Sequence, residues 1–339
     1  MNKALNRHSI GVGGLHLPCL GFGGAALGGL FSAVDPDTAK STLKMAFDAG
    51  LTYVDTAPFY GFGRSERVVG DVLRGQDYIL STKAGRLLRP GAMDDPAAMG
   101  WPDALPFHPE FDYSYDGIMR SYQDSLQRLG LSRIDILYVH DIGRETHGEE
   151  NSRHFADLKN SGYRALDELR NNGDIQAIGL GVNEAEICLE ALKIGDWDVF
   201  LLAGRYTLLE QDPLEGLLPE CQAAGTSIVI GGPFNSGVLV GGDTWNYGAV
   251  PEGVRTRVTA LKKVCDQFNV SLAAAALQFP MAHPVVVSVV PGLRSVDELR
   301  ATLDWAQAEI VPEYWQALKQ NGLLHPNAPT PKGNPFYRN

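Results

Sequence analysis

Residues 115–140, YDGIMRSYQDSLQRLGLSRIDILYVH, place a helix pattern directly before a strand pattern. In the first half, the apolar residues Ile118, Tyr122 and Leu126 recur every four residues, which gives an amphipathic helix one apolar face. Gly130 is predicted to end this helix, because glycine adopts the left-handed conformation found after many helix C-termini. The second half is rich in isoleucine, leucine, tyrosine and valine, which is typical of a strand. The stretch therefore predicts one helix–strand unit of an α/β fold.

The same alternation recurs along the chain. It predicts eight strands, at Leu20–Phe22, Tyr53–Asp55, Tyr78–Lys83, Ile134–His140, Ala177–Gly181, Val199–Leu202, Ser227–Ile230 and Val286–Val290. Helices are predicted at 36–49, 64–74, 115–129, 161–171, 184–194, 214–224, 252–279 (in two pieces) and 295–308. Each helical crossover returns the chain to the same edge, so the strands are parallel. Eight such units in one domain of this size predict a single (β/α)8 TIM barrel.

Segments outside these units have patterns of their own. The glycine-rich run Ser9–Leu17 predicts an N-terminal β-hairpin that plugs the N-terminal end of the barrel. Residues 85–111 are too long for an ordinary connection, so we expect a functional or disordered loop. We expect one barrel domain over residues 1–325, with extra C-terminal helices. A proline-rich tail over 326–339 is expected to be extended, and either mobile or laid over the surface.

Composition excludes several classes of protein. Hydrophobic residues make up 44% of 339 and charged residues 20%, as in a globular chain. The net charge of -11 repels phosphate backbones, so we expect no nucleic acid partner. No apolar run reaches the roughly 18 residues of a membrane span, and the N-terminus has no signal-peptide core. The cysteine spacing suits neither a zinc site nor a disulfide framework, so we expect no metal and a cytoplasmic location. The sequence carries no signal for the oligomeric state.

One glycine motif is misleading. Gly21–Ala26 matches G-x-G-x-x-A after a strand, which is a weak dinucleotide-binding fingerprint. That fingerprint needs a helix that opens at the glycines, whereas the helix here is predicted to open near Pro36. We therefore interpret the motif as a strand end where backbones pack closely.

The chemistry is predicted at the C-terminal ends of the strands, as in other barrels of this kind. Three successive strand ends carry Asp55, Lys83 and His140, and Tyr60 follows Asp55 by five residues. A phenol has a pKa near 10, and an adjacent ammonium favours its phenolate form. A carboxylate can hold that ammonium, and an imidazole can orient a substrate oxygen. Each residue alone also has a structural explanation, such as turn capping or packing, and only their combination favours catalysis.

These residues resemble the active site of the aldo-keto reductases. The motif is Asp55-Thr56-Ala57-Pro58-Phe59-Tyr60-Gly61, followed by Lys83 and His140-Asp141, and the resemblance extends over about 20–303. It implies that Asp55, Tyr60, Lys83 and His140 are catalytic. Residues 115–121, 126–131 and 162–169 are similar to one subgroup, which contains the D-threo-aldose 1-dehydrogenases and pyridoxal 4-dehydrogenase. The resemblance implies NAD(P)-dependent oxidation of a cyclic hemiacetal, of an aldose such as L-fucose or of pyridoxal, to a lactone.

The resemblance also implies a cofactor site after the later strands. Its residues would be Asn183, Phe234, Asn235, Ser236, Gly237, Val238, Arg294, Ser295 and Glu298. The sequence departs from the family pattern in three places: a serine beside Asn183, a glutamine after the sixth strand and a tyrosine after the seventh are missing. Another aromatic ring must then stack on the nicotinamide, or the ring is held differently. Because Arg294 is followed by two carboxylates, we expect NAD rather than NADP.

Other functions remain open at this stage. The same site can act as an NADPH-dependent aldehyde reductase, since the four residues do not fix the direction. A binding or regulatory subunit with a slow reductase site is a third interpretation, but the expected basic or coiled segment is missing. The small-molecule substrate is predicted to contact Phe31, Phe59 and Trp101, because aromatic walls suit a pyridine ring and the apolar face of a sugar.

Overall fold

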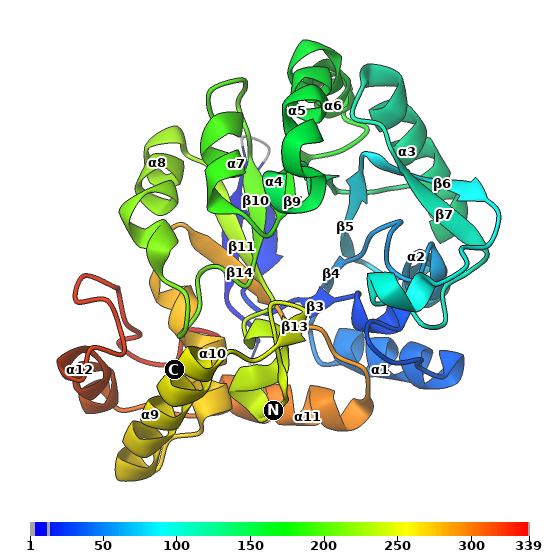
Figure 1. Cartoon of the computed structure of the whole chain (residues 1–339). Helices are drawn as coiled ribbons and strands as arrows, with labels where there is room; N and C mark the ends of the chain where they lie inside the picture. Colours follow the sequence, from blue (N-terminus) through cyan, green and yellow to red (C-terminus); the bar gives the residue numbers. More distant parts are fainter. Residues whose placement is uncertain (1–3, 12–13, 338–339) are drawn as a thin grey trace.

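A barrel of parallel strands forms the centre of the protein in the computed structural model, which describes residues 4–11 and 14–337 (Figure 1). Within those residues, one eight-stranded sheet has the order β14-β11-β10-β9-β8-β5-β4-β3. Its strands are β3 (Phe22–Gly23), β4 (Tyr53–Asp55), β5 (Ile79–Ala84), β8 (Ile136–His140), β9 (Ala177–Val182), β10 (Val199–Ala203), β11 (Ser227–Gly231) and β14 (Val286–Val290). Isolated parallel bridges between Leu20 and Val289 and between Gly23 and Gly292 bring the two edges together. The prediction of a (β/α)8 barrel is confirmed.

Helices surround this barrel. They are α1 (Pro36–Asp48), α2 (Arg64–Leu73), α3 (Tyr115–Leu129), α4 (Arg144–His147), α5 (Asn151–Asp157), α6 (Tyr163–Asn171), α7 (Ala185–Ala191), α8 (Leu217–Ala224), α9 (Glu252–Phe268), α10 (Leu272–Gln278), α11 (Val296–Gln307) and α12 (Pro312–Gln320). Local chemistry sets their ends: the Asp35 carboxylate caps α1 by accepting from Thr38 N at 2.9 Å. Gly130, at φ 61°, ends α3 as the sequence predicts. None of the helices in the described chain is long and apolar enough to cross a membrane.

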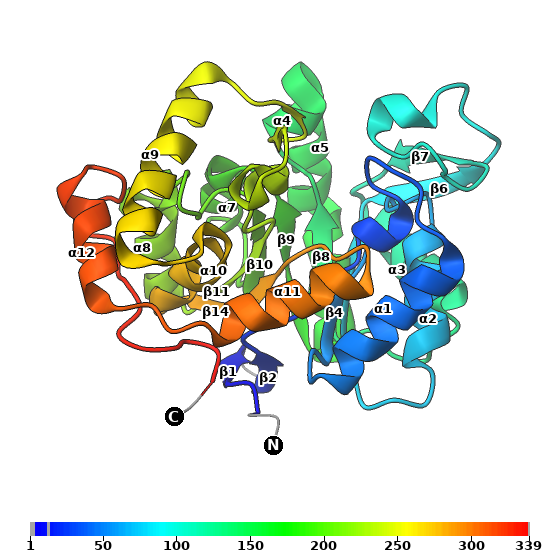
Figure 2. The same ribbon diagram turned by 90° about the horizontal axis from the view of Figure 1, so that it is seen from below.

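The N-terminal hairpin closes one end of the barrel. β1 (Arg7–Ile10) pairs antiparallel with β2 (Leu15–Pro18), and residues 12–13 of the predicted turn lie outside the described residues. Ile10 and Leu17 are buried among inward-facing barrel residues such as Ile136. Figure 2 shows the hairpin beneath the barrel, with β6 (Arg86–Pro90) and β7 (Phe107–Phe111) toward the opposite end. The plug predicted from the sequence is therefore confirmed.

Residues 85–111, predicted as a functional or disordered loop, contain regular secondary structure. β6 and β7 form an antiparallel ladder from Arg86–Phe111 to Pro90–Phe107, and a short 3₁₀ helix, Pro96–Met99, lies between them. The side chains of β7 alternate between half-buried and exposed, which is a strand pattern. Both strands contain prolines and charged residues, which are unusual in strands, so the sequence composition does not predict them.

The tail is laid against the barrel. Phe336 and Ala328 are fully buried, and Asn6 N donates to Phe336 O at 2.8 Å. A bridge between Leu5 and Tyr337 continues this contact, which joins the two ends of the described chain. Residues 338–339 of the predicted tail lie outside the described residues.

The glycine motif at 21–26 is confirmed as a site of close packing. A Cβ atom on Gly24 would lie 2.6 Å from Asp55 O, and one on Gly23 would lie 3.0 Å from Pro291 O. A short 3₁₀ helix, Ala26–Gly28, follows, and α1 opens only at Pro36. The glycines therefore bring β3 against its neighbours at the closing seam.

Candidate active site

A buried ion pair forms the floor of the site at the C-terminal ends of β4 and β5. Lys83 Nζ donates to Asp55 Oδ2 at 2.7 Å and to Thr56 O at 2.9 Å. Ser81 Oγ donates to the other oxygen of Asp55 at 2.7 Å. The two charged side chains are only 2% and 4% exposed. Burial raises the pKa of the Asp55 carboxyl, while the charge of Lys83 opposes that rise.

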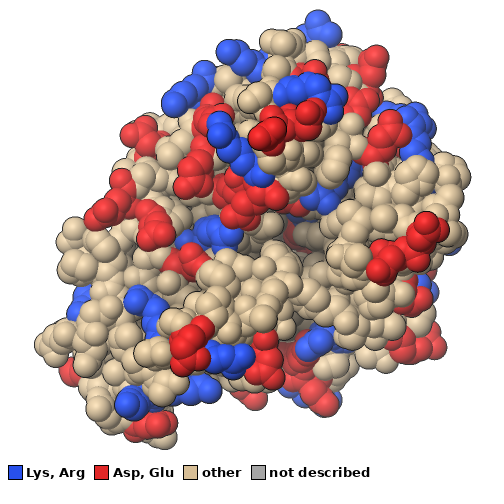
Figure 3. Space-filling model, viewed as in Figure 1, with Lys and Arg blue, Asp and Glu red and all other residues tan. Residues whose placement is uncertain are grey.

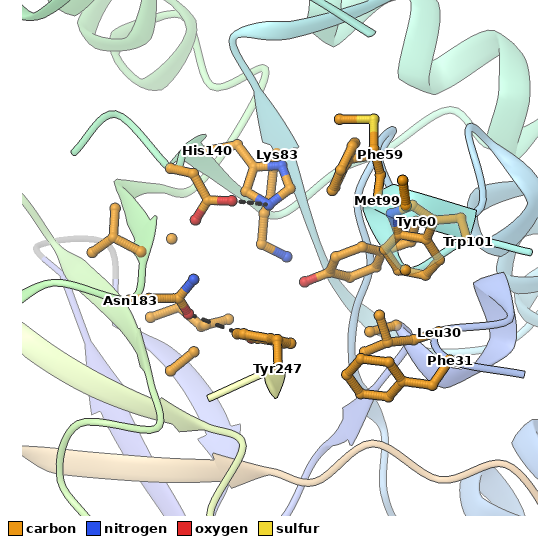
Figure 4. A pocket seen from close by; sticks show the side chains of 18 residues that line it. Leu30, Phe31, Phe59, Tyr60, Lys83, Met99, Trp101, His140, Asn183 and Tyr247 are labelled. Atoms are coloured by element: carbon orange, nitrogen blue, oxygen red, sulfur yellow. Dashed lines mark hydrogen bonds and ion pairs between the residues drawn. The ribbon is translucent and has the colours of Figure 1, made fainter. Parts of the chain in front are cut away.

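Tyr60 lies directly beside this pair. Lys83 Nζ lies 4.6 Å from the centre of its ring, and Figure 4 shows the hydroxyl and the ammonium pointing toward each other. Burial raises the pKa of the phenol well above its usual value, and the charges of Asp55 and Asp141 add to the shift. This is opposite to the direction expected from the sequence. The main physical reason is burial, which disfavours the charged phenolate, and the nearby carboxylates of Asp55 and Asp141 act in the same direction.

His140 closes the other side of the reacting centre. Its ring meets the ring of Tyr60 edge to face, with centres 5.9 Å apart. Burial lowers the pKa of His140 well below its usual value, and the cations Arg86 and Lys83 lower it further. The ring is therefore neutral at physiological pH. Tyr113 holds its backbone by donating to His140 O at 2.8 Å.

A pocket of about 330 Å³ opens above these groups. Its lining includes Tyr60, Lys83 and His140, and Figure 3 shows a hollow near the centre of this face. The walls on one side are apolar: Leu30, Phe31, Phe59, Met99 and Trp101. The three aromatic residues predicted to contact substrate thus all lie in this wall. Trp101 Nε1 is buried without a hydrogen-bond partner in residues 4–11 and 14–337.

A small hairpin covers the other side of the pocket. β12 (Thr244–Trp245) pairs with β13 (Gly248–Ala249), and the turn between them holds Asn246 and Tyr247 at positive φ. Tyr247 lines the pocket and its hydroxyl donates to Asn183 Oδ1 at 3.5 Å, as Figure 4 shows. A smaller cavity of about 50 Å³ adjoins the pocket and shares Asn183, Ala203 and Tyr247 with it.

The segment after β11 carries most of the predicted cofactor residues. Gly232, Asn235, Ser236 and Gly237 all have positive φ. Asn235 and Ser236 both line the smaller cavity, and the Asn235 amide also accepts from Thr207 Oγ1 and donates to Gly204 O. Phe234 packs on Trp305, and Val238 is buried. Only part of the predicted set therefore faces the cavity with its side chains.

The remaining predicted cofactor residues lie at the start of α11. Ser295 Oγ accepts from Glu298 N at 3.2 Å and caps the helix. The Glu298 carboxylate accepts from Arg294 N at 2.7 Å and pairs with its guanidinium at 2.9 Å. The cation expected at the adenosine end is thus already paired.

Comparisons with known proteins agree with this geometry. The sequence model of the aldo/keto reductase family matches residues 19–321. The chain belongs to this family. It is 43% identical to pyridoxal 4-dehydrogenase of Microbacterium luteolum over 95% of this chain and 99% of that protein. It is 38% identical to D-threo-aldose 1-dehydrogenase of a Pseudomonas species, over 94% and 97% of the two chains.

Solved structures show the same fold. The holo form of an aldo-keto reductase from Bacillus halodurans has a TM-score of 0.74 and 25% identity, and the alignment covers 97% of this chain and 98% of that one. The family and the dehydrogenase relatives establish this aldo-keto reductase as an NAD(P)-dependent oxidoreductase. The sequence interpretation of the enzyme class is confirmed.

The segment after β11 is where the sequence predicts the diphosphate of such a cofactor. Asn235, Ser236 and Gly237 all have positive φ, and Asn235 N and Gly237 N donate to Gly232 O and Phe234 O at 3.0 Å within the turns of the segment. A Cβ atom on Gly237 would meet nothing within 4 Å, so open space lies over this backbone. Ser236 and Gly237 are the residues of this aldo-keto reductase that would hold the diphosphate.

The sequence did not predict Arg86 and Tyr247 as residues of the site, and it gave Asp141, which belongs to the motif with His140, no role. Tyr247 supplies an aromatic ring at the pocket, where the sequence lacks the expected tyrosine after β11. No spacing rule leads to it, because it depends on a turn between two-residue strands. Asp141 directly follows His140, and its acidic side chain at a strand end was a signal that could have been used.

Proposed function

We propose that the protein oxidises a cyclic hemiacetal to a lactone with a nicotinamide cofactor. The observation that carries this proposal is the convergence of the Tyr60 hydroxyl and the Lys83–Asp55 pair on one pocket with a neutral His140. The relatives named for oxidation of pyridoxal and of D-threo-aldoses support it. Both substrates form cyclic hemiacetals.

Each residue then has a defined task. Tyr60, as the phenolate, takes the proton of the substrate hydroxyl. Lys83 stabilises that phenolate, and Asp55 fixes the position of the ammonium. His140, held neutral, donates one N–H to the same oxygen and orients it. When bound, the oxidised nicotinamide supplies the hydride acceptor and a positive charge near the phenol.

The cofactor is proposed to be NAD. A 2′-phosphate would need a free cation, and Arg294 is paired with Glu298 at 2.9 Å. The Glu298 carboxylate is instead suited to accept a hydrogen bond from a 2′-hydroxyl. Tyr247 is proposed as the ring that covers the nicotinamide, because it lies over Asn183 beside the reacting centre.

One observation favours a second candidate, the NADPH-dependent reduction of an aldehyde. The raised pKa of Tyr60 keeps the phenol protonated, and a protonated phenol is the acid that reduction needs. The two reactions use the same residues in opposite directions, so the equilibrium and the cofactor decide between them.

A substrate panel tests the proposal. The absorbance of reduced cofactor would be followed with L-fucose, D-arabinose and pyridoxal in the presence of NAD or NADP, and with simple aldehydes in the presence of NADPH. We expect hemiacetal oxidation with NAD, which Tyr60→Phe lowers by ~10²–10⁴-fold while NAD still binds. Reduction of simple aldehydes without any hemiacetal oxidation would favour the second candidate. A Tyr60→Phe variant that keeps more than about a tenth of wild-type kcat would exclude Tyr60 as the base.

A further inference from the structure

A second buried ion pair lies beside His140. Arg86, at the start of β6, is 5% exposed, and its Nη2 donates to Asp141 Oδ2. The guanidinium carbon lies 4.0 Å from the centre of the Phe59 ring and 5.2 Å from that of Phe111. The guanidinium therefore packs against two aromatic rings, which hold it in place beside Asp141.

Only one oxygen of Asp141 is occupied by this pair. Oδ2 accepts from Arg86 and lies 3.4 Å from His140 Nε2. Oδ1 has no hydrogen-bond partner among residues 4–11 and 14–337, although Asp141 lines the pocket. The side chain is 16% exposed, so little solvent reaches it. Because Asp141 lines the pocket, its Oδ1 is available to accept a hydrogen bond from a ligand.

The backbone of Asp141 has an unusual conformation. Its φ is 45°, in the left-handed region, and its N–H donates to Gly181 O at 2.9 Å. Residues other than glycine remain in such conformations where the surrounding structure holds them, and they cluster at binding and catalytic sites. The strained backbone presents the carboxylate to the pocket next to the ring that orients the reacting oxygen.

We propose that Asp141, held by Arg86, determines specificity by accepting a hydrogen bond from a hydroxyl group that flanks the reacting carbon of the substrate. The inference rests on the proposed oxidation for the identity of the reacting carbon. His140 lies beside the reacting oxygen, so a donor within reach of Asp141 Oδ1 must come from a position close to the reacting carbon. Aldoses carry such a hydroxyl at C2, the next carbon of the same ring, and pyridoxal carries one at C3 of the pyridine ring that is fused to the hemiacetal ring.

The test compares ligands that differ in this hydroxyl alone. Tyr60→Phe would serve as the background, because it binds ligand without turnover. Dissociation constants would be measured by calorimetry, with NAD present, for L-fucose and its 2-deoxy analogue and for pyridoxal and its 3-deoxy analogue. We expect loss of the hydroxyl to weaken binding by ~10- to 100-fold for at least one pair, and that pair identifies the source.

Adding Asp141→Asn to the Tyr60→Phe background separates the loss of this hydrogen bond from a general weakening of ligand binding. It should weaken the hydroxylated ligand by about the same factor and leave the deoxy analogue almost unchanged. The matched control is Glu110→Gln, which removes a carboxylate from an exposed pair with Arg89 on the β6–β7 hairpin that also carries Arg86. It should change the dissociation constant of neither the hydroxylated ligand nor its deoxy analogue.

Three results would overturn the inference. The first is equal binding of both members of each pair without Asp141→Asn, a comparison that does not depend on the folding of that variant. The second is an equal loss for both members on Asp141→Asn, and the third is no binding of either pair. Failure of the proposed function gives a different result from failure of this inference. In that case the wild-type enzyme would bind these ligands and oxidise none of them.

Discussion

The effects of replacing Lys83 and Asp55 on the free energy of unfolding should be strongly coupled. At 2.7 Å and an effective dielectric constant of 20, two unit charges attract by about 6 kcal/mol. Desolvation offsets much of this energy, and removal of one partner from a buried pair typically costs about 3–5 kcal/mol. Each remaining partner keeps one neutral hydrogen bond, Lys83 to Thr56 O and Asp55 from Ser81, so we expect about 3 kcal/mol for either single variant.

A double-mutant cycle measures this coupling. Asp55→Asn, Lys83→Met and the double variant would be unfolded in urea at pH 7, followed by tryptophan fluorescence. We expect the double variant to lose far less than the sum of the single losses, with a coupling of at least about 2 kcal/mol. Lys40 and Asp71 are the matched control, because they lie 2.9 Å apart with side chains 45% and 49% exposed.

The surface pair should show a coupling below about 1 kcal/mol. If the buried pair shows no larger coupling than the surface pair, burial does not strengthen this interaction. The expected cost of about 3 kcal/mol for each single variant would then be wrong as well.

Three further predictions concern the pocket and its surroundings. Tyr247→Ala should weaken NAD binding by ~5- to 10-fold, the worth of one aromatic contact, and unchanged affinity in calorimetry would show that the ring does not cover the cofactor. Glu298→Gln should raise the NADP-to-NAD preference by ~2- to 5-fold because it frees Arg294, and an unchanged ratio of kcat/KM values would place the 2′-position elsewhere. Burial, with the neighbouring cations, lowers the pKa of His147 to about 4, so folded His147 stays neutral while the unfolded chain takes up a proton near pH 6.5. Stability should therefore fall as the pH falls from about 6.5 to 4, by about 1 kcal/mol for this part-exposed ring, and the Tm of His147→Gln should fall less over that range than the wild-type Tm.

The barrel and the positions of the four central residues could be predicted from the sequence because they depend on local patterns. Strands such as Ala177–Val182 are buried along their whole length and contrast with the amphipathic stretches on either side. Parallel strands then bring their C-terminal ends to one face, so Asp55, Lys83 and His140 meet without any further information.

The missed features depend on contacts that leave no periodic signal. Tyr247 reaches the pocket only because two successive residues adopt positive φ in a turn between strands of two residues. The pKa of Tyr60 depends mainly on how deeply the phenol is buried, which no local pattern in the sequence shows. The sequence does not reveal the partner of Asp141 either, since Arg86 comes from a hairpin whose composition predicts a loop.

Paired charges determine what the pocket can bind. Lys83 is neutralised by Asp55, Arg86 by Asp141, and Arg205 by Glu145 at the edge of the adjoining cavity. The hollow therefore offers a substrate little net charge, and it selects against ligands that carry one, because their desolvation would not be repaid by a free counter-charge. Polar groups of the substrate must then lie along one edge, toward the phenol, the imidazole and the open carboxylate oxygen. The opposite edge must be apolar to fit the wall that contains Trp101. A cyclic hemiacetal satisfies both conditions, because it is uncharged at the reacting carbon and its ring has an apolar face.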